Sequence, residues 1–155
     1  MGAVSGNTDF TTEGILDTTT TLGGAEAGAF DQAITKTDPA MVMMSLATYQ
    51  SIDPNNPAVF SSTIIDGHIR NALKYTGVVI SDSMSAEALS SYDVSQLGVK
   101  LVEAGGDMSC IGQTDYVKPI VDGLNERAKS DPAFASKVTA AATRVMALKI
   151  KMGLA

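Results

Sequence analysis

Tyr75-Thr-Gly-Val-Val-Ile-Ser-Asp-Ser-Met84 is the stretch that decides the fold of this chain. Its residues 78–80 form an unbroken β-branched run, which is typical of a strand buried on both faces of a parallel sheet. The run ends at Ser81 and at the carboxylate of Asp82. Side chains just beyond the carboxyl end of such a strand converge on the mouth of an α/β fold, where ligands bind. Asp82 is therefore a candidate functional residue, and the capping of a following helix is the alternative, because Asp is a favoured N-cap.

Two further buried strands are predicted, one on each side of this stretch in the sequence. Residues 41–46 (MVMMSL) and residues 107–111 (DMSCI) are both short apolar runs. The strands begin near residues 41, 77 and 107, so each interval has room for about one crossover helix. This spacing predicts repeated βα units in a parallel sheet with right-handed crossovers, and hence an α/β fold class.

Apolar spacing, capping residues and breakers predict the helices between the strands. Residues 1–24 differ from the rest because they are rich in Gly and Thr, which predicts a long loop of the functional kind or a disordered leader. The predicted helices cover residues 25–36, 61–74, 94–104, 115–129 and 131–152, with a short helical turn at 86–89.

The composition narrows the possible partners and compartments. The 155 residues carry a net charge of -6 and no basic cluster, which argues against nucleic acid or an anionic membrane as a partner. No apolar run is long enough to span a membrane, and the first residues lack the regions of a signal peptide. The single cysteine, Cys110, is expected in the core, and it leaves the compartment open. No metal-ligand spacing or phosphate-binding loop occurs, so no cofactor is expected.

The motifs, taken in order, resemble the barrel domain of family 3 glycoside hydrolases, especially the bacterial β-N-acetylhexosaminidase branch. The resemblance implies a partial (β/α)8 TIM barrel over residues 25–155, made of strands six to eight with their helices. Residues 1–24 then resemble the active-site loop that follows the fifth strand. The stretches that carry the resemblance are Met41-Val-Met-Met-Ser45, the pattern Tyr49–Asp53–Pro57-Ala58–Ser61, Ile69-Arg70, Leu73, residues 77–84, Glu103-Ala-Gly-Gly-Asp-Met108, Arg144-Val-Met-Ala-Leu-Lys149 and Gly153-Leu154.

The resemblance also implies an activity, the hydrolysis of β-linked N-acetylhexosamine or related β-glycosides with retention. Asp82 corresponds to the nucleophile, which forms a glycosyl ester that water then hydrolyses. The family branch has a His as acid/base, with an Asp two residues before it. Here those positions fall on Asp9 and Asn7, and Asp9 as a plain loop-capping residue is an equal alternative. Asn7 and Met84 are the candidate substrate-binding residues.

Several departures from the family pattern limit what the chain is expected to do alone. The Lys-His-Phe-Pro-Gly stretch and strands one to five have no counterpart, and Ser83 stands where the family has a second acidic residue. The expected partners are therefore a carbohydrate substrate and either the missing N-terminal barrel half or a second copy of the chain. Without one of these, the strand edges and the inner face of the sheet would be uncovered.

Two residues and two other functions complete the set of expectations. His68 is expected to be a surface or packing residue, and Asp107 is expected to form a cap or turn. A non-catalytic half-module for binding or assembly is the main functional alternative. A phosphoacceptor signalling domain, with Asp82 phosphorylated, is less favoured because the acidic pair that would hold Mg²⁺ is lacking.

Overall fold

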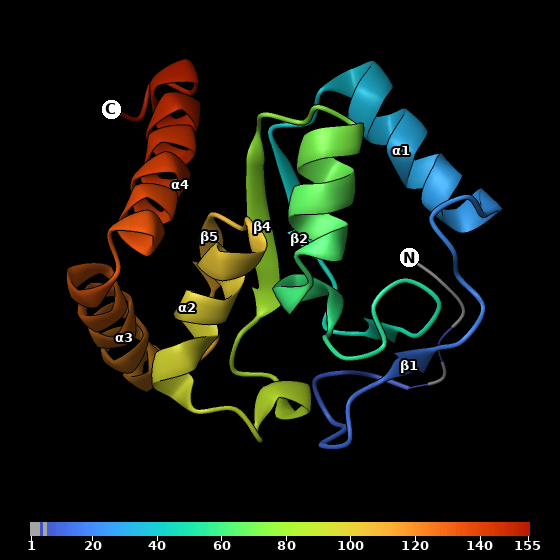
Figure 1. Cartoon of the computed structure of the whole chain (residues 1–155), viewed down its shortest axis with the longest axis horizontal. Helices are drawn as coiled ribbons and strands as arrows, with labels where there is room; N and C mark the ends of the chain where they lie inside the picture. The colour runs from blue at the N-terminus through green and yellow to red at the C-terminus, as the bar shows by residue number, and fades with distance from the viewer. Residues whose placement is uncertain (1–3, 5) are drawn as a thin grey trace.

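A computed structural model of the chain, shown in Figure 1, describes residue 4 and residues 6–155. Its centre is a three-stranded parallel sheet in the order β2 (Met41–Met44), β4 (Val78–Ser83) and β5 (Met108–Cys110). The three predicted strands and their parallel pairing are thus confirmed. A second, two-stranded parallel sheet pairs β1 (Leu16–Asp17) with β3 (Thr48–Tyr49), so the predicted loop over residues 1–24 contains one very short strand.

The predicted helices are all present, and most of their ends lie within a few residues of the prediction. The apolar spacing at 61–74 did not reveal that this helix is a π-helix, in which Leu73 N donates to His68 O, five residues earlier, at 2.9 Å. The helices are α1 (Ala25–Thr37), η2 (Thr63–Ala72), α2 (Val94–Ala104), α3 (Val117–Ser130) and α4 (Pro132–Lys151), with 3₁₀ turns η1 (Ala58–Phe60), η3 (Glu87–Leu89) and η4 (Thr114–Tyr116).

Local chemistry sets the ends of these helices. Asp131 caps α4 by accepting hydrogen bonds from the backbone N–H groups of Ala133 and Phe134 at 2.9 and 3.1 Å, and Pro132 occupies the first turn. Gly105 ends α2 at a φ of 102°, a left-handed conformation that glycine adopts without strain. None of the helices in the described residues is both long and apolar enough to cross a membrane.

The main core lies between the sheet and the helices η2 and α2. Val78 and Val79 are fully buried, as the β-branched run predicted, and Leu97 and Ile65 pack in the core from α2 and η2. The alternation along β2 differs from the prediction. Met44 is buried, but Met43, one residue earlier and on the opposite face, is 65% exposed.

Two expectations about burial were therefore wrong, and both concern strands at the edge of the sheet. Met41 and Met43 were predicted in a buried strand, but both side chains are exposed; the edge position of β2 itself agrees with the expected uncovered edge. Cys110 was expected in the core, but it lies at the end of the other edge strand, β5, and is also exposed. An apolar run predicts a strand, but it does not say which face is covered.

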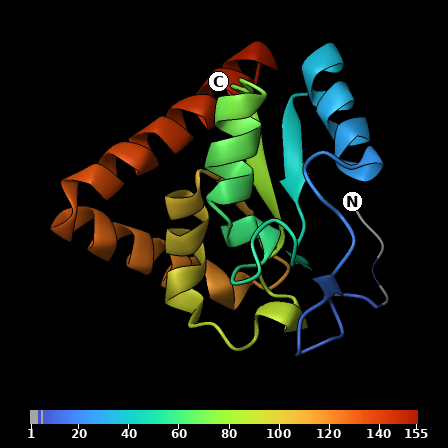
Figure 2. The same ribbon diagram turned by 45° about the vertical axis from the view of Figure 1, so that its right-hand side comes forward.

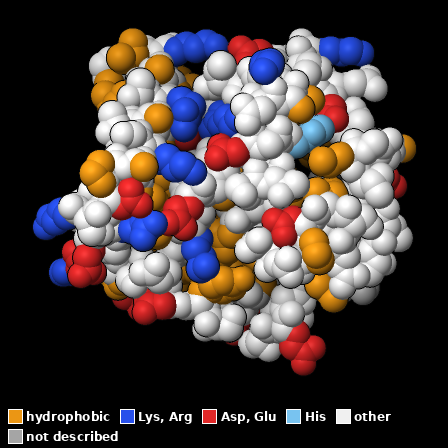
Figure 3. All heavy atoms as spheres, in the orientation of Figure 1, with side chains coloured by type: hydrophobic (Ala, Val, Ile, Leu, Met, Phe, Trp, Pro, Cys, Tyr) orange, Lys and Arg blue, Asp and Glu red, His pale blue; other side chains and the backbone are white. Residues whose placement is uncertain are grey.

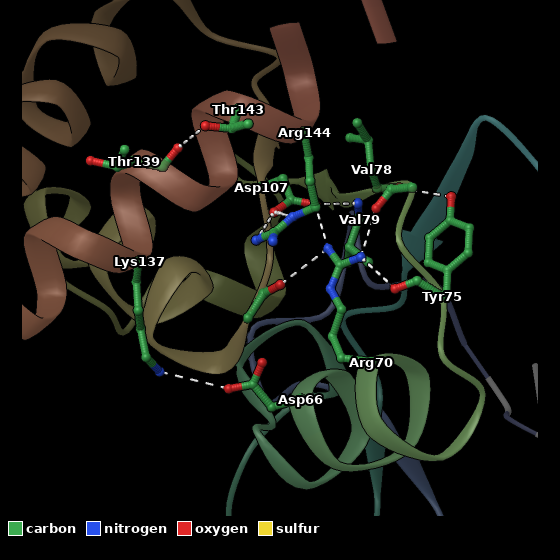
Figure 4. A network of polar contacts seen from close by, with 12 residues as sticks. Asp66, Arg70, Tyr75, Val78, Val79, Asp107, Lys137, Thr139, Thr143 and Arg144 are labelled. Carbon is green, nitrogen blue, oxygen red and sulfur yellow. Dashed lines mark hydrogen bonds and ion pairs between the residues drawn. The ribbon is translucent and has the colours of Figure 1, made fainter. Parts of the chain in front are cut away.

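A buried ion-pair network ties the sheet to two helices (Figure 4). The side chain of Asp107, just before β5, has no solvent exposure and pairs with Arg70 from η2 and Arg144 from α4. One carboxylate oxygen also accepts a hydrogen bond from Val79 N in β4 at 2.7 Å. The expectation that Asp107 forms a cap or turn was wrong, because its partners lie 37 residues away on either side in the sequence.

The same network fixes the connection that leads into β4. Arg70 donates hydrogen bonds to Tyr75 O at 3.1 Å and to Gly77 O at 2.6 Å. The hydroxyl of Tyr75 in turn donates to Pro39 O at 2.8 Å, just before β2. The ends of β2, β4 and β5 where the strands begin are thereby joined through side chains.

We expect Asp107→Ala to lower the free energy of unfolding by about 3–5 kcal/mol, because it removes one partner of a buried ion pair and leaves two arginines uncompensated. The measurement is urea unfolding followed by circular dichroism at fixed protein concentration. Asp131→Ala is the control, since the loss of a partly exposed helix cap costs about 1 kcal/mol. Equal effects of the two substitutions would contradict the central role of Asp107.

The exposed apolar surface around β2 generates a second prediction. A cavity of about 90 Å³ between α1, β2 and η2 is lined by Phe30, Met43 and other apolar side chains. Figure 3 shows this hydrophobic surface beside His68, the single histidine. At roughly 25 cal/mol per Å², each 100 Å² of apolar surface that is covered contributes about 2.5 kcal/mol.

We therefore expect the isolated chain to associate with itself at sub-millimolar concentration, measured by sedimentation equilibrium. Met43→Glu should weaken this association, because a charge in the contact must be desolvated. Leu154→Glu, at a similarly exposed residue outside the patch, is the matched control and should have no effect. A strictly monomeric chain without dye-binding hydrophobic surface would contradict this expectation.

Candidate active site

Asp82 lies near the carboxyl end of β4, the central strand of the parallel sheet. Its side chain is half-buried, and the nearer carboxylate oxygen accepts a hydrogen bond from Ser83 N at 2.7 Å. The following turn η3 begins only at Glu87, so capping by Asp82 is not the role that the structure shows. The carboxylate therefore stands at the end of the sheet where α/β folds place reactive groups.

A β-bulge fixes the backbone at this carboxylate. Ile80 pairs with Met108 and Ser83 with Cys110, so β4 advances three residues while β5 advances two. Bulges of this kind re-aim side chains and are frequent beside active sites.

Hydrogen bonds on both sides of Asp82 hold the bulge. Ser81, which is fully buried, accepts a hydrogen bond from Cys110 N through its Oγ at 2.9 Å. Two residues beyond Asp82, Met84 N donates to Cys110 O, also at 2.9 Å. Asp82 is thus placed between two residues that are both bonded to the same residue of β5.

Small polar groups line the turn that follows. The hydroxyls of Ser83 and Ser85 lie 3.1 Å apart, and Gly112 N donates to Ser85 Oγ at 3.1 Å. A Cβ at Gly112 would approach Ser85 Oγ to 2.9 Å, so the close contact favours glycine. The side chain of Met84 is fully buried in the core, and its assignment to substrate binding stays a prediction.

The loop that carries Asp9 lies at the same end of the sheet. Asp9 is exposed in a turn where its N–H donates to Asn7 Oδ1 at 2.9 Å. Ala88 N, six residues after Asp82, donates to Thr8 O at 3.0 Å. Figures 1 and 2 both show this loop beside η3. The structure therefore brings the two predicted catalytic carboxylates to one end of the sheet.

The side chain of Asn7 shapes the turn around Asp9. The backbone oxygen of Asn7 also accepts hydrogen bonds, from Phe10 N at 3.1 Å and from Thr11 Oγ1 at 2.9 Å. The bond from Asp9 N to the side chain of Asn7 is that of an Asx turn, and the bond from Phe10 N to the Asn7 backbone oxygen is that of a β-turn. A further role of Asn7 in substrate binding stays a prediction.

The Tyr49–Asp53–Ser61 part of the sequence pattern has a structural explanation. Ser61 Oγ donates to Asp53 Oδ2 at 2.7 Å and accepts from Ile64 N at 3.2 Å, so it links the loop after β3 to the start of η2. Burial raises the pKa of Asp53, but hydrogen bonds from Ser61 and Asn56 outweigh this effect and hold the pKa below its usual 3.8. Asp53 is thus kept ionised, and its bond with Ser61 holds the loop after β3 against the start of η2.

His68 is a packing residue, as expected. Its Nε2 lies 2.8 Å from Asp31 Oδ1, which joins η2 to α1. In the part of the chain that the structure describes, no group of three or more His, Cys, Asp or Glu side chains is arranged to hold a metal ion.

Comparison with known proteins identifies what the chain resembles. The family model described as "Glycosyl hydrolase family 3 N terminal domain" matches residues 2–148. The structure of the β-N-acetylhexosaminidase from Beutenbergia cavernae superposes with a TM-score of 0.87 and 36% sequence identity, covering 94% of this chain. A family 3 β-N-acetylglucosaminidase from Paenibacillus sp. superposes with a TM-score of 0.79 and 26% identity, covering 90% of this chain.

The chain corresponds to only part of each of these relatives. It spans 43% of the Beutenbergia chain and 27% of the Paenibacillus chain. A glycosyl hydrolase described as uncharacterized and secreted, from Arthroderma benhamiae, is 36% identical over 69 residues, which is 44% of this chain and 20% of that protein.

Proposed function

The chain belongs to glycosyl hydrolase family 3, and we propose that it contributes the catalytic nucleophile Asp82 to a retaining glycosidase. The substrate class is β-linked N-acetylhexosamine or a related β-glycoside. The observation that carries the proposal is the position of Asp82, which is fixed by a bulge at the carboxyl end of the central parallel strand. The names of the Beutenbergia and Paenibacillus relatives support the sugar class.

The proposed architecture is a partial (β/α)8 barrel over residues 25–155, in which β2, β4 and β5 are strands six to eight. Residues 1–24 form the active-site loop of the same barrel. The parallel strand order supports this assignment, and so does the position of β2 at the edge of the sheet, where Met43 is exposed. In addition, α1 leads into β2 as a crossover helix would lead from a preceding parallel strand. The proposed partner is the remaining barrel half, and the isolated chain is inactive because its sugar pocket lacks the other wall.

The mechanism follows from the two carboxyl groups. The Asp82 carboxylate attacks the anomeric carbon while the bond from that carbon to the leaving oxygen breaks. The carboxylic acid of Asp9 gives its proton to the leaving oxygen, and this yields a glycosyl ester on Asp82. Asp9 then takes a proton from water, which attacks the same carbon and releases the sugar with its original configuration. Asn7 holds the turn that presents Asp9.

We expect a 2-fluoro glycoside with a good leaving group to label Asp82 in the intact enzyme that contains this chain. After digestion at glutamate, which separates the two residues at Glu87, mass spectrometry should find the adduct on the peptide with Asp82 and not on the one with Asp93, a carboxylate at the cap of α2. Asp82→Ala should lower kcat by roughly 10⁴-fold or more. A stable adduct on another residue would overturn the nucleophile assignment.

We expect Asp9→Ala to lower kcat/KM by about 10²–10⁴-fold for a glycoside whose leaving group needs protonation. For a dinitrophenyl glycoside the loss should be small, because that leaving group departs without a proton. Glu13→Ala, at another exposed carboxylate of the same loop, is the matched control. Equal losses for both substrates would remove Asp9 as the acid.

A further inference from the structure

Asp17 is a buried carboxylate that the proposed mechanism does not use. It belongs to the same segment as Asp9, yet it has no solvent exposure, whereas Asp9 is exposed. A buried charge is costly unless hydrogen bonds compensate it, so its contacts indicate what it does.

Asp17 closes a turn in the loop. Its Oδ1 accepts hydrogen bonds from Thr19 N at 2.9 Å and Thr20 N at 2.7 Å, and its Oδ2 accepts from Thr20 Oγ1 at 2.6 Å. Hydrogen bonds to a charged group are stronger than neutral ones. Two threonines of the Gly- and Thr-rich segment, Thr19 and Thr20, thus serve as donors to one carboxylate.

The backbone at Asp17 joins this turn to the segment after β2. Gln50 N donates to Asp17 O at 2.9 Å, and Thr48 N donates to Ile15 O at 2.8 Å. Tyr49, which lies between Thr48 and Gln50 in the sequence, is buried. Burial raises its pKa, a hydrogen bond with Ser45 lowers it, and the negative charge of Asp17 raises it further. Asp17 and Tyr49 are also paired directly with each other in the register of β1 and β3.

The loop is thus fixed at two points, and Asp9 lies between them in the segment from Thr8 to Asp17. One point is the bond from Ala88 N to Thr8 O, and the other is the β1–β3 pairing at Asp17. The residues between are mostly exposed, and they are joined by short-range bonds such as that from Gly14 N to Thr11 O at 3.3 Å, which do not attach them to the sheet. The position of Asp9 depends on both attachments.

We infer that Asp17 is a positioning residue, which holds the second attachment and so places the Asp9 carboxyl for proton transfer. The catalytic part of this inference rests on the proposed function. The attachment of the loop by Asp17, here called the clamp, does not. Asp17→Ala would leave the N–H groups of Thr19 and of the buried Thr20 without their acceptor, which favours local opening of the loop. Asp17→Asn keeps one acceptor oxygen and should retain most of the attachment.

Hydrogen exchange on the 155-residue chain tests the clamp. The amides of Thr48 and Gln50 should exchange at least about tenfold faster in Asp17→Ala than in the unaltered chain, and much less so in Asp17→Asn. Asp93→Ala is the matched control, because Asp93 accepts equivalent bonds from Ser95 N and Oγ at the start of α2. Unchanged exchange at Thr48 and Gln50 in Asp17→Ala overturns the inference.

Kinetics of the intact enzyme test the effect on catalysis. Asp17→Ala should lower kcat/KM at least about tenfold for a glycoside whose leaving group needs protonation, and much less for the dinitrophenyl glycoside. Equal losses for both would show a merely structural residue and overturn the positioning role. If Asp9→Ala shows no dependence on the leaving group, the acid assignment and the catalytic part of this inference fail together, while the exchange result still reports on the clamp.

Discussion

The structure depends on the burial of Asp107 between Arg70 and Arg144. A carboxylate with no solvent exposure is tolerated only when charges and donors surround it, so these three side chains constrain η2, β5 and α4 together. Val79 N completes the set of donors and brings in the central strand. The network is therefore better understood as a device that fixes one arrangement of the elements than as a source of net stability.

This constraint acts at the end of the sheet where the strands begin, and Asp82 lies at the other end. The two ends are built differently. Around Asp107 the contacts are charged and buried, whereas around Asp82 they come from small hydroxyl groups and backbone N–H groups, such as Ser81 Oγ and Ser83 N. The buried network and the candidate catalytic carboxylate thus lie at opposite ends of the sheet, a separation typical of α/β barrels. Among the described residues Asp82 has no ion-pair partner, so its carboxylate is available for the proposed attack on a substrate.

The sequence predicted those parts of the fold that repeat over short distances. β-Branched and apolar runs gave the three parallel strands, and capping residues such as Asp131 gave the helix ends. The Asp107 network was missed because its partners lie 37 residues away on either side, and no local pattern encodes such pairs. Asp17 was missed because a two-residue strand has no periodicity. The edge positions of the two outer strands, β2 and β5, were predicted, but the exposure of the Met43 and Cys110 side chains was missed, because an apolar run alone indicates burial.

The two attachments of the loop matter for the candidate site because they restrict where Asp9 can lie relative to Asp82. A retaining glycosidase needs its two carboxyl groups about 5 Å apart, which a freely moving loop could not maintain. Here the loop is bonded at Thr8 to the segment after β4 and at Asp17 to the segment after β2. Both segments follow the carboxyl ends of strands that pair side by side in the same sheet. The sheet that fixes Asp82 therefore also fixes the frame in which Asp9 is presented, and one set of strand pairings sets the relative position of both groups.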